Sequence, residues 1–200
     1  MSTREVTAGL SADVLTAGPP PVPMLTPPWT VRSLTPGGDD PALVSRWMNE
    51  PHVALFWQQA WPPARWAEDL ASQRAGDYSR PLLISLEGDP FAYVEVYRTP
   101  RDVIGPHYGA ACFDLGIHLA IGNLASTGRG LGRQMVRAVA LGLGAADARV
   151  RRILADPDER HLMARRMFLA AGFAFLGVHD LGHKNAALYA FPLPNPEGRS

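Results

Sequence analysis

The sequence has very little cysteine and no excess charge. Cys112 is the only thiol in 200 residues, which excludes an intrachain disulfide framework and a cysteine-rich zinc site. The 19 basic and 19 acidic side chains leave a formal net charge of zero, so no overall field attracts nucleic acid or an anionic membrane. We therefore expect no metal, no nucleic-acid partner and no membrane partner, and any anion site must be local.

Long apolar runs are also missing. No stretch of about 18 apolar residues occurs, and the first residues lack the basic and apolar regions of a signal peptide. These absences predict a soluble, cytoplasmic protein. A chain of this length can bury enough surface to form one domain with a sizeable core.

Proline, in contrast, is abundant and unevenly placed. The chain has 19 prolines, about twice the usual share of roughly 5%. The segment AGPPPVPMLTPPW has no helix or strand period and is typical of an extended, polyproline-like chain. We predict a disordered leader over residues 1–28, a single domain over 29–193 and a flexible tail over 194–200.

Helix and strand patterns alternate along this domain. The predicted order is a strand after Trp29, helices beginning at Asp40-Pro41 and Pro62-Pro63, a hairpin around Gly88-Asp89-Pro90, a strand over 113–121, a helix to about Leu143, a strand over 151–156, a helix ending at Gly172, and two final strands. The hairpin strands pair antiparallel, whereas the crossover makes strands 113–121 and 151–156 parallel neighbours. The pattern thus predicts an α/β fold with flanking helices.

The strand FDLGIHLAI carries a histidine on an unusual face. Its alternation places Gly116, His118 and Ala120 together, opposite a row of apolar core residues. Glycine inside a strand often marks close approach by a ligand or by another backbone, so there is room for something beside His118. A histidine with satisfied partners in the core is the alternative.

An aspartate follows the next parallel strand, RRILAD. Asp156 lies at the carboxyl end of that strand, where ligands bind in open α/β sheets. Because Pro157 follows it, Asp156 cannot simply cap a continuing helix. The alternative is that Asp156 or Asp158 caps the helix that begins near Glu159.

The stretch TGRGLGRQMV joins the histidine strand to a helix. A helix N-terminus offers unpaired N–H groups to an anion, and glycines allow close approach. The spacing of Gly128, Gly130 and Gly132 fits neither a Walker loop nor a dinucleotide-binding fingerprint. From the residues alone, a plain turn and a phosphate cradle are both open.

Two motifs together resemble the GNAT acyltransferase superfamily. TGRGLG matches its Q/R-x-x-G-x-G/A motif except at Thr127. Downstream, the spacing of a second family motif is matched by His161, Ala164, Phe168, Gly172 and Phe173. Within the superfamily the chain looks most like the siderophore-biosynthesis branch of lysine and hydroxylysine acyltransferases, through WMNEPHVALFW, RDVIGPHY, FDLGIHLAI, RGLG and ADPDERH.

This resemblance implies a GNAT-like fold, in which a mostly antiparallel sheet contains a central parallel pair. It implies acyl transfer from acyl-CoA or acetyl-CoA, without a metal, to the side-chain amine or hydroxylamine of lysine or ornithine, as in hydroxamate siderophore biosynthesis. The pyrophosphate would bind at Gly128, Arg129, Gly130, Leu131, Gly132 and Arg133. His118 would contact the acceptor and Asp156 would be the base. The tyrosine acid common in the family falls on Phe168, so the leaving thiolate needs another proton source.

Four aromatic residues are candidates for the acceptor pocket. Trp57 and Trp61 lie beside two glutamines and off the helical core pattern, although most tryptophans in this region should be core. His107 and Tyr108 precede the histidine strand, and a surface loop explains them equally well.

Two other functions fit part of the sequence pattern. An aminoglycoside 6′-N-acetyltransferase shares the glycine motif, but a polycationic substrate demands an acidic cleft and RTPRDVIGPHYGAAC has one acidic residue. A catalytically silent acyl-CoA-binding module is the second alternative. An acyl carrier protein could replace CoA as the donor and would then be a partner.

Overall fold

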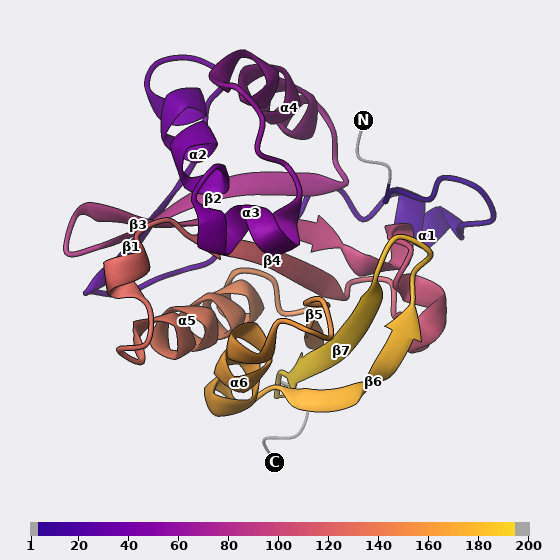
Figure 1. The fold of residues 1–200 in the computed structure, drawn as a ribbon. Coiled ribbons are helices and arrows are strands. Elements are labelled where there is room, and N and C mark those ends of the chain that lie inside the picture. The colour runs from indigo at the N-terminus through magenta and orange to yellow at the C-terminus, as the bar shows by residue number, and fades with distance from the viewer. Residues whose placement is uncertain (1–3, 195–200) are drawn as a thin grey trace.

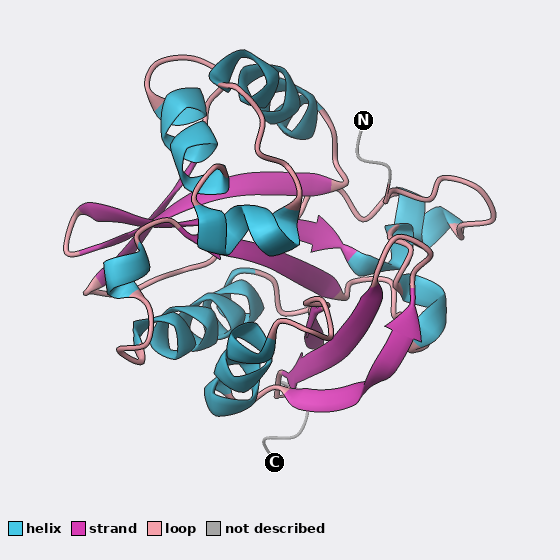
Figure 2. Ribbon diagram, viewed as in Figure 1, coloured by secondary structure: helices cyan, strands magenta, loops and turns pink. Residues whose placement is uncertain are grey.

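A seven-stranded mixed sheet forms the centre of the computed structural model, which describes residues 4–194. Its order is β1-β2-β3-β4-β5-β7-β6, and all neighbours are antiparallel except β4 and β5. Helices α2, α3 and α4 lie over one face, and α5 and α6 lie over the other (Figures 1 and 2). The predicted α/β fold, with its parallel central pair, is confirmed.

The elements follow the predicted order closely. The strands are β1 (Trp29–Ser33), β2 (Ser79–Leu86), β3 (Asp89–Arg98), β4 (Leu115–Ile121), β5 (Arg152–Ala155), β6 (Ala174–Asp180) and β7 (Asn185–Pro192). The α-helices are α1 (Ala12–Leu15), α2 (Asp40–Met48), α3 (Pro51–Trp57), α4 (Pro63–Ala75), α5 (Leu131–Ala146) and α6 (Leu162–Ala171). Short 3-10 turns are η1 (Thr99–Arg101), η2 (Gly105–His107) and η3 (Leu124–Ser126).

Local chemistry explains where the helices begin and end. Helix α4 starts at Pro63, where a missing N–H costs nothing, and α6 ends at Ala171, directly before Gly172, whose φ of 100° favours glycine. Asp40 opens α2 as predicted, but its carboxylate binds Arg32 and the N–H of Thr35 instead of capping the helix. Helix α3 was not anticipated.

Each face of the sheet has its own core. Under α5 and α6 the core contains Val96, Ile117 and Ile153, among others. Under α2 and α4 it is aromatic, with Trp47, Trp66 and Tyr93 packed together. Alternation along each strand therefore sends one set of side chains to each layer of helices.

The proline-rich leader makes contacts with the domain. The Arg98 side chain donates hydrogen bonds to the carbonyls of residues 17–19, and Arg80 donates to the carbonyl of Pro20. Proline has no N–H but keeps its carbonyl, so a proline-rich segment can serve as a row of acceptors. We expected a disordered leader over residues 1–28, whereas the described part of it includes α1 and contacts the domain through residues 17–20. Most of the predicted tail, 195–200, lies outside the described residues.

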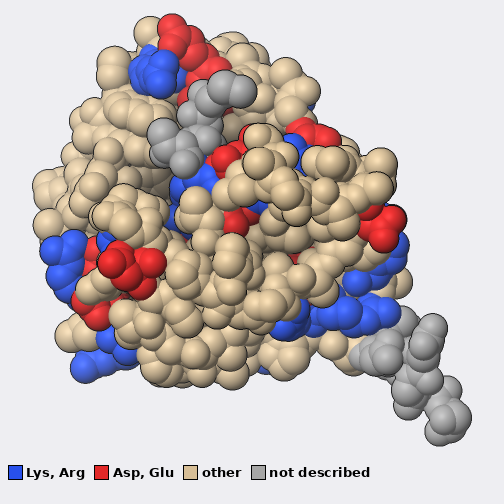
Figure 3. Space-filling view, turned by 90° about the vertical axis from the view of Figure 1, so that its right-hand side faces the viewer, with Lys and Arg blue, Asp and Glu red and all other residues tan. Residues whose placement is uncertain are grey.

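Three properties that the composition addresses can be compared with the structure: surface charge, membrane-spanning helices and metal-binding clusters. On the face in Figure 3, basic and acidic side chains lie together in several groups, and a band at the lower right is basic. Among residues 4–194, no helix has the length and apolarity to cross a membrane. That same part of the chain has no cluster of His, Cys, Asp or Glu suited to a metal ion.

Candidate active site

The histidine of β4 belongs to a row of paired side chains on two strands. In the β3–β4 register, Glu95 lies opposite His118 and Tyr97 lies opposite Gly116. The Tyr97 ring stacks on the imidazole with centroids 4.4 Å apart. A Cβ atom added to Gly116 would lie 2.2 Å from Cζ of this ring. The space that we expected beside His118 for a ligand is therefore filled by Tyr97 at Gly116.

Asp156 connects this row to two other parts of the chain, through Arg4 and Lys184. One carboxylate oxygen, Oδ1, lies 2.9 Å from the Tyr97 hydroxyl and 3.1 Å from Nε2 of His118. The other, Oδ2, lies 2.9 Å from Arg4 and 3.0 Å from Lys184. Lys184 also donates to the Asp156 carbonyl at 2.6 Å. The Asp156 side chain is completely buried, and each oxygen has two partners.

Charges in the cluster shift the pKa values of Asp156 and His118. The cluster consists of Arg4, Glu95, Tyr97, His118, Asp156 and Lys184. Burial raises the pKa of the Asp156 carboxyl, but the positive charges of Arg4 and Lys184 outweigh it and hold that pKa well below its usual range. For His118, burial opposes protonation, and the Asp156 carboxylate nevertheless raises the pKa of the imidazole. The two shifts act in the same sense: the Asp156 carboxyl is held as the anion, and protonation of the neighbouring His118 imidazole is favoured.

Access also distinguishes the two residues. The His118 side chain is 18% exposed, whereas Asp156 has no exposed area. Nδ1 of His118 lies 3.3 Å from the Glu95 carboxylate, so the ring is held between two acids. An incoming nitrogen can approach His118 directly, and it would reach Asp156 only through the imidazole or by displacing a cation.

The parallel strands β4 and β5 separate next to this cluster. β4 and β5 pair at only two positions, Leu115 with Ile153 and Gly116 with Leu154, although β4 continues to Ile121. The N–H of Gly122 points toward β3, where it binds the Phe91 carbonyl. Because successive residues point their main-chain groups to opposite sides, those of residues 117 and 119 face the open edge.

The glycine stretch begins α5 at the end of this opening. Gly130 precedes the helix with a φ of 80°, and Gly128 has a φ of 72° with no atom within 4 Å of an added Cβ. Gly132 packs on α6, because a Cβ there would lie 2.8 Å from Sδ of Met167. Arg129 and Arg133 are exposed, and within the described residues neither side chain has a hydrogen-bond or ion-pair partner.

The tryptophan candidates divide between site and core. The Trp57 ring lies edge-on to His118 with centroids 6.1 Å apart, and its Nε1 donates to Gln59. Trp61 packs instead on the buried Trp66, with centroids 5.1 Å apart. Of the two, Trp57 is the one that the fold brings to the histidine.

The other two pocket candidates contact different groups. His107 is exposed and its ring lies 5.1 Å from that of His179. The Tyr108 hydroxyl lies 2.5 Å from the Thr99 hydroxyl and 3.3 Å from the Asp114 carboxylate. Within residues 4–194, neither forms a hydrogen bond, ion pair or ring contact with His118 or Asp156.

Phe168 and Asp158, the two remaining candidates, lie in contacts that stabilise the fold. Phe168 is buried on the opposite face of the sheet, where it stacks on Tyr189. Asp158 does not cap α6, whose N-cap is His161; it binds the Arg160 side chain at 2.7 Å. The helix-cap alternative therefore holds for neither aspartate.

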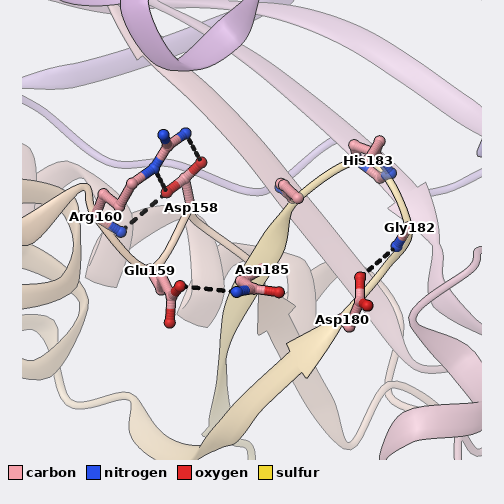
Figure 4. A pocket seen from close by; sticks show the side chains of 8 residues that line it. Asp158, Glu159, Arg160, Asp180, Gly182, His183 and Asn185 are labelled. Atoms are coloured by element: carbon pink, nitrogen blue, oxygen red, sulfur yellow. Dashed lines mark hydrogen bonds and ion pairs between the residues drawn. The ribbon is translucent and has the colours of Figure 1, made fainter.

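A polar cavity of about 360 Å³ lies beside the cluster. Its lining comes from Asp158, Glu159, Arg160, Asp180, Gly182, His183, Lys184 and Asn185 (Figure 4). Figure 4 shows its acids already bonded: Asp158 to Arg160, Glu159 to Asn185 and Asp180 to the N–H of Gly182. Lys184 connects the cavity to Asp156.

Several members of the cluster were missed in the sequence. Alternation in FAYVEVYR places Tyr93, Glu95 and Tyr97 on one face, and pairing that strand with FDLGIHLAI would have placed Glu95 beside His118. Arg4 and Lys184 give no such signal, because they come from irregular segments that only the tertiary fold brings to Asp156.

Comparison with known proteins defines the family. The model of the acetyltransferase (GNAT) domain matches residues 38–181. A lysine N-acyltransferase, MbtK, from Mycobacterium sp. (strain MCS) is 42% identical over 189 residues, which covers 94% of this chain and 77% of that protein. The N(6)-hydroxylysine O-acetyltransferase of Escherichia coli is 28% identical, covering 72% of this chain and 46% of that protein.

Solved structures agree with this assignment. The aminoglycoside acetyltransferase AAC(6′)-Ib in complex with coenzyme A has a TM-score of 0.73 and 26% identity, covering 86% of this chain and 99% of that one. The chain belongs to the GNAT family and is an acyltransferase.

Proposed function

We propose that this protein transfers an acyl group from acyl-CoA to the side-chain amine or hydroxylamine of lysine or ornithine, a step of hydroxamate siderophore biosynthesis. The observation that carries the proposal is the contact of His118 with Asp156 beside the open edge of β4. The names of the similar proteins support it, since lysine and hydroxylysine are the acceptors named there.

The donor would bind at the N-terminus of α5. The N–H groups of Gly130, Leu131, Gly132 and Arg133 can donate to the pyrophosphate, because the start of a helix leaves them without intrahelical partners. Those of Gly128 and Arg129 precede the helix and would extend the same site. Arg129 and Arg133 are exposed beside them and add positive charge. The thioester then extends toward the open edge of β4.

The transfer step needs a polarised carbonyl and a neutral nitrogen. The N–H of residue 119 faces the open edge and can donate to the thioester oxygen as its charge develops. The acceptor nitrogen forms a bond to the carbonyl carbon, the C–S bond breaks, and the nitrogen proton passes to His118, whose positive charge the Asp156 carboxylate stabilises. Phe168 cannot protonate the departing thiolate, so water or another group does so.

The acceptor would approach from the side of Trp57. That ring and His118 form the accessible part of the cluster. A free lysine amine, with a pKa of about 10, needs deprotonation more than a weakly basic hydroxylamine does. The length of the acyl chain on the CoA donor is varied in the assay.

Steady-state acylation tests the proposal. Acetyl-CoA and longer acyl-CoA donors are assayed against lysine, N-hydroxylated lysine and N-hydroxylated ornithine, with an aminoglycoside as the comparison acceptor. We expect turnover with at least one of the amino acids. No turnover with any of them, or turnover with the aminoglycoside alone, would contradict it.

A further inference from the structure

The most unusual contact of the site is made by Arg4, which lies far from it in the sequence. The guanidinium Nη2 is 2.8 Å from Asp102 and 2.9 Å from Asp156, and Nε is 3.1 Å from Asp102. One side chain thus joins two carboxylates, neither of which has any exposed side-chain area. The Arg4 side chain itself is 15% exposed.

The backbone around Arg4 is held in place by the segment after β3. The Val103 N–H donates to the Arg4 carbonyl at 3.1 Å, and the Val6 N–H donates to the Arg101 carbonyl at 2.8 Å. The neighbouring Glu5 pairs with Arg101 at 2.5 Å. These main-chain hydrogen bonds place Arg4 next to Asp156, so its position does not depend on the side chain alone.

We propose that Arg4 is a positioning residue of the active site: its guanidinium fixes the Asp156 carboxylate, and through that carboxylate it sets the orientation and charge of His118. The inference rests on the proposed function only for the measurements of acyl transfer, because the titration of His118 needs no substrate. A carboxylate held by Arg4 on Oδ2 presents Oδ1 to Tyr97 and His118, which fixes the ring against rotation.

The charges around His118 give the expected direction. Glu95 and Tyr97 face it from β3, Asp156 from the end of β5, and Lys184 reaches the same carboxylate from the β6–β7 turn. Arg4 repels the imidazolium and lowers the pKa of His118, whereas Asp156 raises it. Loss of the Arg4 charge should therefore raise the pKa of His118, leaving less neutral imidazole to accept a proton.

The test compares Arg4→Gln and Arg4→Lys with a matched control, Glu5→Gln. Glu5→Gln removes the carboxylate that pairs with Arg101, whereas the main-chain hydrogen bonds on either side of Glu5 and the Arg4 contact with Asp156 do not use that side chain. The titration of His118 is followed by NMR in the protein without substrates, with the signal assigned by its loss in His118→Gln. This readout does not need acyl transfer, so it separates failure of the inference from failure of the proposed function.

We expect the His118 midpoint to rise in Arg4→Gln and to stay in place in Glu5→Gln. On the acidic limb of the pH profile, kcat/KM should fall about tenfold for each unit of that rise. An unmoved midpoint, or an equal movement in Glu5→Gln, would overturn the inference. Faster acylation in Arg4→Gln would also overturn it, because Arg4 would then be competing with the acceptor.

Arg4→Lys keeps the proposal testable if Arg4→Gln fails to fold. Lysine keeps the positive charge, but its ammonium group is a compact point charge that cannot join both carboxylates as the guanidinium does. Because the charge is kept, the proposal predicts a folded protein with a pH profile close to that of the wild type. A loss of activity as large as that of Asp156→Asn would overturn the role of charge.

Discussion

Gly116→Ala tests how tightly the cluster around His118 is packed. A Cβ at this position would lie 2.2 Å from Cζ, 2.5 Å from the hydroxyl oxygen and 2.6 Å from Cε1 of Tyr97. Because that ring is completely buried, it has no open side to which it could retreat. The ring must shift, and its 2.9 Å hydrogen bond to Asp156 breaks.

Two costs add in this variant. Overpacking a buried site costs roughly 1–3 kcal/mol. Loss of a hydrogen bond to a charged group costs about 1.5–3 kcal/mol. We therefore expect Gly116→Ala to lower the free energy of unfolding by about 2.5–6 kcal/mol, a large part of the ~5–15 kcal/mol of a typical domain.

Urea unfolding measures this effect. Gly37→Ala is the matched control, since nothing lies within 4 Å of its added Cβ, and we expect a change of no more than about 0.5 kcal/mol. In a Tyr97→Leu background the clash is gone, so Gly116→Ala should cost much less there. A Gly116→Ala protein as stable as Gly37→Ala would refute the packing argument.

Three further predictions concern catalysis, donor binding and acid stability. Asp156→Asn should lower kcat by roughly 10²- to 10⁴-fold and leave the Kd for CoA near the wild-type value; an unchanged rate would remove Asp156 from the mechanism. Arg129→Ala and Arg133→Ala should each weaken CoA binding in calorimetry, by less at high salt, and equal binding would argue against the cradle. Beside Arg160, the pKa of Asp158 is lowered to about 2 from its ordinary 3.8. Its stabilisation is therefore complete above pH 3.8 and lost as the pH falls toward 2, so Asp158→Asn should flatten the dependence of the urea midpoint on pH in this range.

The regular part of the molecule could be predicted because its signals are local. Pro63 and Gly172 mark helix ends through their own backbone preferences. The period of two in β4 identified the face that carries His118. A βαβ crossover has one common handedness, so the parallel pair followed from the order of elements.

The same reasoning misread the small residues around His118. Gly116 was expected to leave room for a ligand, whereas it accommodates Tyr97 from the adjacent strand. Strand pairing is non-local, so the partner across the sheet cannot be read from one strand. Arg4 is a stronger case: it reaches Asp156 across 152 positions of sequence, and no periodic pattern predicts such a contact.

The central claim is acyl transfer to a side-chain nitrogen, and the structure of the product tests it most directly. The acceptor that turns over fastest is incubated with its acyl-CoA donor, and the acylated atom is located by NMR and mass spectrometry. We predict one acyl group on the side-chain nitrogen and one equivalent of free CoA. Acyl groups on the α-amino nitrogen, or CoA released without any acylated acceptor, would contradict the account.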